Sequence, residues 1–597
     1  MKFSELALYF QKIEETSSRL TITELLAQLF TELRLDEVIQ TTYLLQGRLS
    51  PSFEKIESGM AEKMVIKSIL LAMQIDRDIF TKEYRKMGDL GKTVEHFKKE
   101  IQTIEKKDAS VLEVFEDLYT LATSSGTGSQ DVKAGILSKL IRELDPLSAN
   151  YVVRIPIGVM RLGFSDMTVL DALSWMITKD KTLRPTIEKA YHVRPDLGLI
   201  ARAIKESGVA GLIKIKPAVF TPIIMMRAER LSSGQEIIDQ IGRCAVEPKY
   251  DGFRLQIHIK RKNGKTKVKL YSRNLEEVSF MYPDVIAGVT KEIKGEEVIL
   301  EGEAIGFDPH SGTFLPFQET VQRKRKYGIE AKALEIPLKL FAFELLYHNG
   351  ENLLRTPYEE RRKKLQKIIR VTGDIFKDVV LVSPEHIIED PKKLELLFDD
   401  SISKGLEGII AKKLDGIYQP GARGWNWIKF KRSYSSKIED TIDCLVMGYD
   451  VGKGKRSGFG IGAFLAGVYD ASQDKYVTVA KIGTGLTDIE WKELKKRCDK
   501  FHTAHKIALY EADKMMEVDV WVKPEIIVEI KADEITKSPV HTAGRTLKSS
   551  KSGSAMMVDN PGLALRFPRL QRFRDDKRPE EATTLKELES MYKEQGK

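Results

Sequence analysis

With 597 residues, the chain is long enough for about three to five domains. Its hydrophobic fraction of 42% excludes a wholly disordered chain, and no apolar run approaches the roughly 18 residues of a membrane span. The net charge of +9, from 96 Lys and Arg against 87 Asp and Glu, is compatible with a nucleic acid partner but does not require one. The first residues lack the pattern of a signal peptide, so we expect a cytoplasmic protein with no membrane partner. Abundant Lys and Glu beside few Asn residues are typical of thermophilic proteins.

Residues 1–217 are predicted to form an all-α domain. Apolar residues recur every three or four positions in Met64–Met73 and Ile136–Leu144, and Thr21–Glu24 has the pattern of a capping box before another apolar run. The Gly- and Ser-rich segment Ser124–Ser129 interrupts this pattern. Its simplest interpretation is a loop between helices, but a small turn that leads into a helix could also offer backbone N–H groups to a phosphate.

Residues 218–432 change to a mixed α+β pattern. Apolar and polar residues alternate in Phe253–Ile259, and Lys262–Lys265 contains the Asn-Gly pair typical of a two-residue hairpin turn. Further strands are expected at Glu297–Phe307, Leu338–Tyr347, Gly408–Lys412 and Trp427–Phe430, with helices at Tyr358–Ile369 and Lys392–Lys404.

Residues 433–597 are predicted to form short strands separated by glycines. These strands are expected at Cys444–Tyr449, Ala463–Tyr469, Tyr476–Ile482 and Glu525–Lys531. The pattern suits a small β-barrel of the oligonucleotide-binding (OB) class, followed from Pro579 by a short charged helical tail. The expected fold is therefore multidomain, with an all-α domain, an α+β domain and a β-barrel domain.

Candidate catalytic residues gather in the middle domain, beginning with Glu247–Arg254, in which Lys249 stands at the start of a strand before an Asp-Gly pair. A lysine nucleophile must be neutral when it attacks, so it needs desolvation or nearby cations that lower its pKa. Taken alone, this segment could equally be a surface hairpin with a salt bridge.

Other fragments follow it in the same domain. Glu301 and Glu303 lie in an apolar strand, where an unpaired carboxylate is costly unless a metal or ligand relieves it. Phe341 or Phe343 could stack on a base or fill the core. The remaining fragments are Ser272–Asn274, the strand from Glu407 to Lys412, and Lys429 with Lys431 on one face of a strand. Each is more easily structural when taken alone, but their ordered occurrence together is not explained by chance.

This ordered set resembles the six motifs of the covalent nucleotidyltransferases, which include DNA ligases and mRNA capping enzymes; the sixth motif is Arg572–Lys577. Over nearly the whole chain, the sequence is similar to ATP-dependent DNA ligases of the archaeal and eukaryotic replicative type. In the helical domain, Gly126–Ser129 and Arg154–Gly163 look like the DNA-binding segments of that family.

The resemblance implies a role for each matching residue. Lys249 would attack the α-phosphate of ATP and hold AMP as a phosphoramide, with Glu247 at the adenine edge and Phe343 stacked on the purine. Phe341 could exchange roles with Phe343. Contacts with ribose or phosphates are implied for Arg254 and Arg273, and with ribose or divalent metal for Glu303 and Glu407. Lys429 and Lys431 would bind the α-phosphate and later the 5′-phosphate of the nick. The pyrophosphate would be oriented by Arg572, Arg574 and Lys577. The implied DNA-binding residues are Gly126, Gly128, Ser129, Arg154 and Arg161.

The implied cofactors are ATP and Mg²⁺, with Mn²⁺ as a substitute; Mg²⁺ needs only one or two carboxylates beside substrate phosphates. These residues do not exclude ADP, GTP or NAD⁺. The three cysteines, which are far apart, exclude the cysteine-rich module of NAD-dependent bacterial ligases. The implied partner is nicked duplex DNA bound by a monomer. Segment His96–Glu105 contains no convincing sliding-clamp peptide.

Two other functions compete with DNA ligation. RNA capping or RNA ligation would use the same lysine chemistry, but a capping enzyme does not need a helical domain to encircle duplex DNA. A non-catalytic DNA-binding protein with a decayed transferase domain should have lost some motif residues, and no chemistry-bearing position is missing. Nick sealing in replication, repair and recombination is therefore the expected function.

Overall fold

A computed structural model describes residues 1–100, 107–310, 312–315, 317–325, 327–370, 372–404, 406–431, 441–452, 460–483, 486–549 and 556–595. It divides into two compact units, Met1–Phe430 and Lys431–Lys597. The first unit begins with a helical part and continues with a mixed α+β part. No helix among the described residues is long and apolar enough to cross a membrane.

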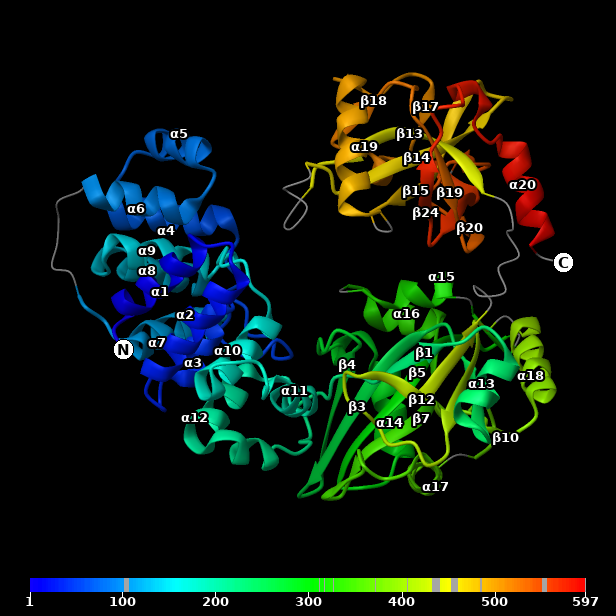
Figure 1. Cartoon of the computed structure of the whole chain (residues 1–597), viewed down its shortest axis with the longest axis horizontal. Helices are drawn as coiled ribbons and strands as arrows, with labels where there is room; N and C mark the ends of the chain where they lie inside the picture. Colours follow the sequence, from blue (N-terminus) through cyan, green and yellow to red (C-terminus); the bar gives the residue numbers. More distant parts are fainter. Residues whose placement is uncertain are drawn as a thin grey trace. The chain divides into compact units, whose positions relative to one another are not determined.

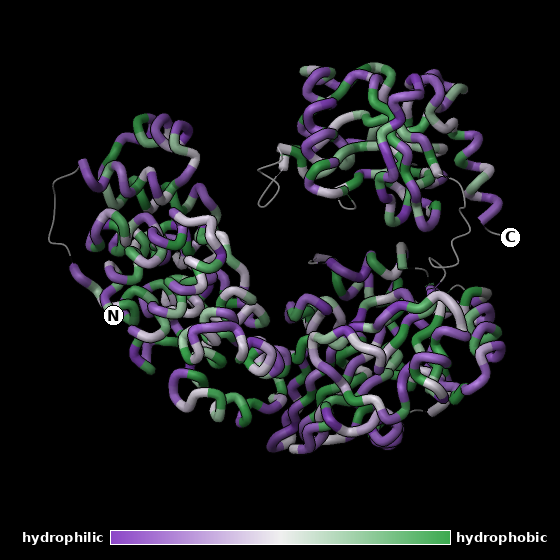
Figure 2. Tube along the Cα trace, viewed as in Figure 1, coloured by the Kyte–Doolittle hydropathy of each residue, from purple (hydrophilic) through white to green (hydrophobic). Residues whose placement is uncertain are grey.

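The helical part packs around one apolar core. Along its helices, green apolar segments alternate with purple polar ones (Figure 2). Its helices are α1 Phe3–Glu14, α2 Arg19–Glu32, α3 Val38–Leu45, α4 Glu62–Met73, α5 Arg77–Met87, α6 Leu90–Glu100, α7 Val111–Thr123, α8 Ser129–Glu143, α9 Pro146–Arg154, α10 Asp166–Thr178, α11 Arg184–Val193 and α12 Leu197–Ile213. Helices α4 and α8 confirm the predicted periodic segments. The predicted start of α2 was wrong, because Ser18 is its N-cap and accepts a hydrogen bond from Thr21 N. In the segment His96–Glu105, which was considered for a sliding-clamp peptide, residues 101–105 lie outside the described residues.

The mixed part contains two sheets (Figure 1). Its strands are β1 Arg227–Arg230, β2 Cys244–Lys249, β3 Phe253–Lys262, β4 Lys265–Ser272, β5 Glu297–Asp308, β6 Thr313–Phe314, β7 Leu338–His348, β8 Glu351–Asn352, β9 Val380–Val382, β10 His386–Ile388, β11 Gly408–Lys413 and β12 Arg423–Lys431. Its helices are α13 Gly234–Ile241, α14 Pro283–Glu292, α15 Phe317–Thr320, α16 Ile329–Glu335, α17 Tyr358–Ile368 and α18 Pro391–Ser403.

The first sheet has the order β1-β12-β11-β2-β10, and the second has β4-β3-β5-β7-β8, with β6 and β9 paired to β5 and β7. The predicted hairpin is confirmed: Lys262 pairs with Lys265, and Asn263 and Gly264 both have positive φ. The strands and helices predicted for this part are all present, with shifts of a few residues at their ends.

The second unit is mostly β-structure. Its strands are β13 Ile442–Asp450, β14 Ala463–Asp470, β15 Lys475–Ile482, β16 His502–Thr503, β17 Tyr510–Glu511, β18 Val520–Val522, β19 Ile527–Lys531, β20 Glu534–Ser538, β21 Thr546–Ser549, β22 Met556–Asn560, β23 Gly562–Arg566 and β24 Arg569–Phe573. Helices α19 Asp488–Lys500 and α20 Leu585–Glu594 accompany them, and α20 lies in the predicted tail. The pairings among the described strands do not close a ring, so the expected closed barrel is not shown.

Candidate active site

Strand alternation places the candidate residues of the first sheet on one face. Val246, Ile409 and Ile428 pack into the apolar core beneath α13 and α18. Their neighbours Glu247, Lys249, Lys412, Trp427 and Lys429 therefore lie on the opposite face. That face meets the second sheet, because the Trp427 ring on β12 contacts the Phe343 ring on β7 with centroids 6.1 Å apart. The candidate site thus lies between two sheets, each covered on its far side by helices.

Lys249 ends β2 and forms a close ion pair with Glu407, the residue before β11. Both side chains are about one-fifth exposed, at 21% and 19%. Glu303 on β5 lies near this pair, and the pKa of its carboxyl is raised to about 7: burial raises it most, Lys249 and Arg254 oppose that shift, and Glu407 adds to it. The backbone of Gly252 also hydrogen-bonds Glu303, and a Cβ at Gly252 would lie only 2.4 Å from the Ala304 carbonyl oxygen. The glycine of the Asp-Gly pair is therefore required by close packing of the backbone.

Glu247 is 3% exposed and is held by two donors. Tyr358 OH lies 2.6 Å and Lys412 Nζ 2.9 Å from the same oxygen, Oε1. Lys412 is itself buried and also donates to the carbonyl of Phe343 at 2.9 Å. Burial lowers the pKa of the Lys412 ammonium, although Glu247 and Glu344 oppose that shift. This end of the site is buried, and Glu247 Oε1 is paired within the protein.

Arg254 on β3 lies within the same site, but its guanidinium is already engaged. It donates to Glu301 at 2.8 Å and to the Met226 carbonyl at 2.9 Å, and it lies over the rings of Phe343 and Trp427. Its Nε is buried without a hydrogen-bond partner in the described structure. Glu301 was expected to be costly to bury without a metal or ligand. It is completely buried, and its carboxylate accepts hydrogen bonds from Arg254, Gln256 and Tyr418.

Two aromatic residues on β7 were candidates for stacking on the base. Phe341 is buried and stacks on the Tyr250 ring with centroids 4.2 Å apart, so its faces are used in the core. Phe343 is only partly buried and lies between Arg254 and Lys412. The geometry therefore favours Phe343 as the stacking residue.

Three further candidate cations lie at different positions in the chain. Arg273 is exposed in the turn after β4, and Lys429 is partly buried on β12. Strand β12 runs on to Lys431, the first residue of the second unit. No group of three or more His, Cys, Asp or Glu side chains able to hold a metal occurs within the described ranges.

Comparison with known proteins decides the family. Residues 225–431 match the model described as "ATP dependent DNA ligase domain", residues 2–174 match "DNA ligase N terminus", and residues 457–577 match "ATP dependent DNA ligase C terminal region". The chain is 46% identical over 598 residues to "Probable DNA ligase" of Dictyoglomus turgidum, covering 100% of this chain and 98% of that protein. It is 40% identical over 600 residues to "DNA ligase 2" of Korarchaeum cryptofilum, with coverages of 100% and 98%. The chain belongs to the ATP-dependent DNA ligase family.

A solved structure named Pmar-Lig_Pre supports the shared fold of this ligase. It has a TM-score of 0.51 and 16% identity, covering 95% of this chain and 99% of that chain. The ligase is therefore multidomain, with a helical N-terminal domain, a central adenylation domain and a C-terminal domain.

The third candidate group of the ligase lies in its C-terminal unit. Arg572 pairs with Glu529 at 2.6 Å, whereas Arg574 pairs with Asp443 at 3.0 Å and with Asp576 at 2.8 Å. Lys577 also pairs with Asp443, at 2.8 Å. The structure thus brings all three cations together in one ion-pair cluster.

The DNA-binding candidates in the helical domain differ in exposure. Gly126 and Gly128 are exposed, have φ of +91° and +82°, and lead directly into α8 at Ser129. Arg161 is half exposed and pairs with Asp89 at 3.0 Å. Arg154 is 1% exposed, so its assignment to DNA was wrong. Its guanidinium is enclosed by the carboxylates of Glu14 and Asp89, at 2.7 and 3.1 Å.

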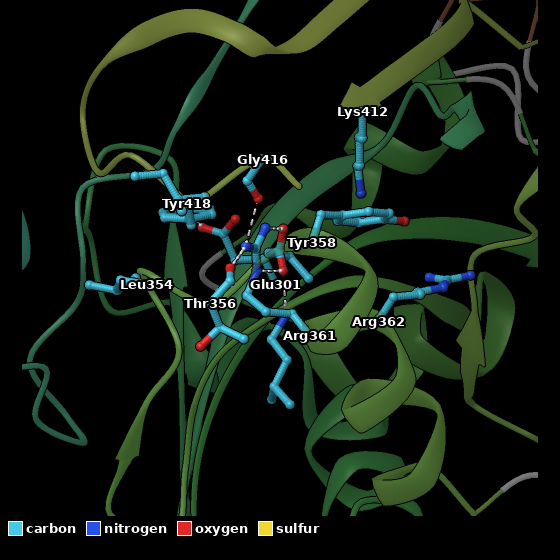
Figure 3. A network of polar contacts seen from close by, with 12 residues as sticks. Glu301, Leu354, Thr356, Tyr358, Arg361, Arg362, Lys412, Gly416 and Tyr418 are labelled. Atoms are coloured by element: carbon cyan, nitrogen blue, oxygen red, sulfur yellow. Dashed lines mark hydrogen bonds and ion pairs between the residues drawn. The ribbon is translucent and has the colours of Figure 1, made fainter. Parts of the chain in front are cut away.

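Sequence reasoning missed the residues that hold the site residues in place. Tyr358, Arg362 and Tyr418 were not singled out, and Lys412 was noted without a role. Helix α17 is anchored by Arg361, which donates to Glu344 at 2.8 Å and to the Gly416 carbonyl at 3.0 Å (Figure 3). The one available signal was that polar residues recur within otherwise apolar segments, where burial requires partners.

Proposed function

We propose that this chain seals 5′-phosphate/3′-hydroxyl nicks in duplex DNA through a lysyl-AMP intermediate, in replication, repair and recombination. The observation that carries the proposal is the contact between Lys249 and Glu407 beside Glu303, in the site between the two sheets that also contains Phe343 and Arg254. It joins a nucleophile, an adjacent proton acceptor and a stacking surface in one partly open site.

In the first step, Lys249 Nζ loses a proton to the adjacent Glu407 carboxylate and attacks the α-phosphorus of ATP. The new N–P bond replaces the bond to the bridging oxygen, and pyrophosphate leaves with the bonding electron pair. Phe343 stacks on the purine, while Arg254 and Arg273 hold the ribose and phosphates. The cations Lys429, Lys431, Arg572, Arg574 and Lys577 neutralise the α-phosphate and the departing pyrophosphate.

In the second step, a 5′-phosphate oxygen of the nick attacks the phosphorus of the lysyl-AMP. The N–P bond breaks, Glu407 returns its proton to Nζ so that Lys249 leaves as an amine, and the DNA carries a 5′-5′ phosphoanhydride. In the third step, the 3′-hydroxyl loses its proton to solvent as its oxygen attacks the 5′-phosphorus, AMP leaves with the electron pair of the anhydride bond, and the phosphodiester forms. Lys429 and Lys431 act again here, on the phosphate of the nick.

Glu303 and Glu407 fit a divalent cation of the kind this family uses, Mg²⁺ or Mn²⁺. Two carboxylates near each other, one with a raised pKa, form an oxygen donor set that a hard cation stabilises. When bound, the ion would withdraw charge from the phosphate that is transferred. The protein residues alone still position the nucleophile and the base.

The remaining proposals concern domains and partners. We assign residues 1–217 to DNA binding, 218–432 to adenylation and 433–597 to an OB-fold with a helical tail. In the first domain, Gly126 and Gly128 offer backbone N–H groups, Ser129 offers its hydroxyl because its N–H donates to the Gly126 carbonyl, and Arg161 offers a cation, so that the contacts go to phosphates and not to bases. We propose a cytoplasmic monomer.

Incubation with α-labelled ATP followed by denaturing electrophoresis tests the proposal. The wild type should retain the label, and unlabelled nicked duplex should then discharge it as the nick is sealed. Lys249→Ala should retain none, whereas Lys260→Ala, which removes another strand lysine paired with a glutamate at 2.7 Å, should label normally. Absence of label on the wild type, or undiminished label on Lys249→Ala, would reject the proposed site.

A further inference from the structure

The two carboxylate oxygens of Glu247 have different surroundings. Oε1 receives a hydrogen bond from Lys412 Nζ at 2.9 Å and lies 2.6 Å from Tyr358 OH, whose single proton is shared between Oε1 and Glu385 Oε2, 2.5 Å from the hydroxyl. The Arg362 guanidinium, 3.7 Å away, also faces Oε1. Oε2 accepts no hydrogen bond from any residue that the structure describes. One oxygen is therefore saturated by the protein, and the other is left as an acceptor.

The two donors cannot easily turn away. Lys412 is 1% exposed, its ammonium lies 4.9–5.1 Å from the ring centres of Phe343, Tyr358 and Trp427, and it also donates to the Phe343 carbonyl. Tyr358 is the first residue of α17 and is equally buried, and its ring lies against the end of the Lys412 side chain (Figure 3). Because these groups are fixed, the orientation of the Glu247 carboxylate is fixed with them.

The acceptor oxygen lies close to the stacking surface. Lys412 Nζ is 2.9 Å from Glu247 Oε1 and 5.1 Å from the centre of the Phe343 ring. The Glu247 carboxylate and the Phe343 ring therefore both lie next to the same ammonium group. A base stacked on Phe343 would turn an edge toward Glu247. An atom on that edge that meets Oε2 must be a hydrogen-bond donor, because an acceptor there would face a buried negative charge without a proton between them.

We propose that Lys412 and Tyr358 are positioning residues that fix Glu247 as an obligatory acceptor, and that they thereby select a purine with an amino group at position 6 over one with a keto group. The inference rests on the proposed function and deepens it by assigning the base specificity to named groups. Lys412 and Tyr358 act only through Glu247.

Glu247→Gln gives the sharpest test, because the two donors dictate how the new amide must lie. Its carbonyl oxygen must occupy the Oε1 position, since Lys412 has no acceptor to offer an NH₂ group. The NH₂ group then takes the Oε2 position and becomes a donor toward the base. The site should lose its preference for a 6-amino purine and gain one for a 6-keto purine.

The measurement compares rates of covalent labelling, as kcat/KM, with α-labelled ATP and α-labelled inosine triphosphate, which differ in the amino or keto group at position 6 and in the N1 proton that the keto base carries. We expect the wild type to favour ATP by at least about tenfold, and the ATP-to-inosine ratio to fall by at least about tenfold in Glu247→Gln. Adding Lys412→Met to Glu247→Gln removes the orienting cation, so the ratio should move to within about threefold of one.

Tyr358→Phe tests the second donor while leaving the carboxylate in place. It should lower the ATP-to-inosine ratio by about threefold, because Glu247 is then held by Lys412 alone. The matched control is Tyr347→Phe, which also removes a tyrosine donor to a glutamate, Glu297 at 3.1 Å, on the same strand as Phe343. That control should keep the wild-type ratio.

The outcomes separate this inference from the proposed function. If the wild type forms no covalent adduct with ATP, the proposed function fails and the inference falls with it. If the wild type labels with ATP but Glu247→Gln keeps its nucleotide ratio, the inference alone is overturned. Loss of labelling with both nucleotides, in a Glu247→Gln protein that unfolds at the wild-type temperature, overturns it too. Should Glu247→Gln fail to fold, an unchanged ratio in Tyr358→Phe overturns the inference.

Discussion

Lys249 and Lys412 lie at opposite ends of one pair of hydrogen-bonded strands, β2 and β11, and their surroundings differ sharply. Lys412 is 1% exposed and is enclosed by three aromatic rings, a carboxylate and a backbone carbonyl. Lys249 is 21% exposed and pairs with Glu407, itself 19% exposed. Lys412 is fully engaged by contacts within the protein, whereas Lys249 is accessible to a substrate.

The helical domain repeats this division with arginines. Arg154 and Arg161 share the partner Asp89, but Arg154 is 1% exposed and Arg161 is 50% exposed. In both domains, burial separates cations that hold the protein together from cations that can meet a phosphate. The predictions below test whether that separation holds, beginning with the largest effect.

Lys249→Arg should lower the rate of covalent AMP formation at least about 1,000-fold, because an arginine keeps its charge and cannot be the nucleophile. Sealing of a nick that is already adenylylated should be retained, since that step needs no amine at this position. Lys260→Arg is the control and should act as the wild type in both assays. Equal losses in the two assays would mean that Lys249 serves the fold or the DNA instead of the first step.

Arg154→Met should destabilise the protein by about 3–5 kcal/mol, because it leaves the Glu14 and Asp89 carboxylates buried without their cation. Urea unfolding measures the loss. Arg161→Met is the matched control, because it removes a half-exposed arginine from the same Asp89 and should cost less than about 1 kcal/mol. Similar losses in both variants would remove the distinction between the two arginines.

Glu303→Gln should change stability in a pH-dependent manner. The pKa of Glu303 is raised to about 7, so ionising this carboxyl costs folding free energy, and the wild type loses stability as the pH rises from about 4.5 through 7. With a chelator present, the variant should therefore match the wild type near pH 4 and exceed it at pH 8 by up to about 3 kcal/mol.

Glu297→Gln, on the same strand β5, should have the opposite sign. A hydrogen bond from Lys260 lowers the pKa of Glu297, so its stabilising effect is present at pH 8 and is lost in acid. A Glu303→Gln protein that is less stable than the wild type at pH 8 would contradict the raised pKa.

Most of the adenylation domain could be predicted from local pattern. The β3–β4 hairpin follows from strict alternation and an Asn-Gly turn, and alternation also predicted Lys429 and Lys431 on one face of a strand, which is β12. The ordered motifs identified Lys249 and Glu303 by resemblance, and the pairing of Lys249 with Glu407 gives that assignment a geometric basis.

What could not be predicted depends on partners far apart in the chain. Tyr358 and Glu247 are 111 residues apart, and Arg154 and Glu14 are 140 apart, so no local pattern joins them. Arg154 follows the apolar pair Val152 and Val153, which was the available sign that its side chain is buried. The start of α2 was misplaced because Ser18 and Thr21 both carry capping hydroxyls, and only the backbone shows which one is used.

Arg161→Ala should have the smallest effect on the fold and a selective effect on DNA. Affinity for nicked duplex should fall, and the slope of log affinity against log salt should become shallower by about 0.9, because one phosphate contact is lost. Covalent labelling with ATP should be unchanged, since Arg161 lies outside the adenylation domain.

Lys179→Ala is the matched control. Lys179 is another exposed cation of the helical domain with positive φ, +61° against +60° for Arg161, so the same charge is lost from the same backbone conformation. If both variants shift the slope equally, the effect is one of net charge. If neither does, the exposed arginine beside Asp89 does not meet the DNA, and the phosphate contacts of this domain belong to the glycine turn before α8.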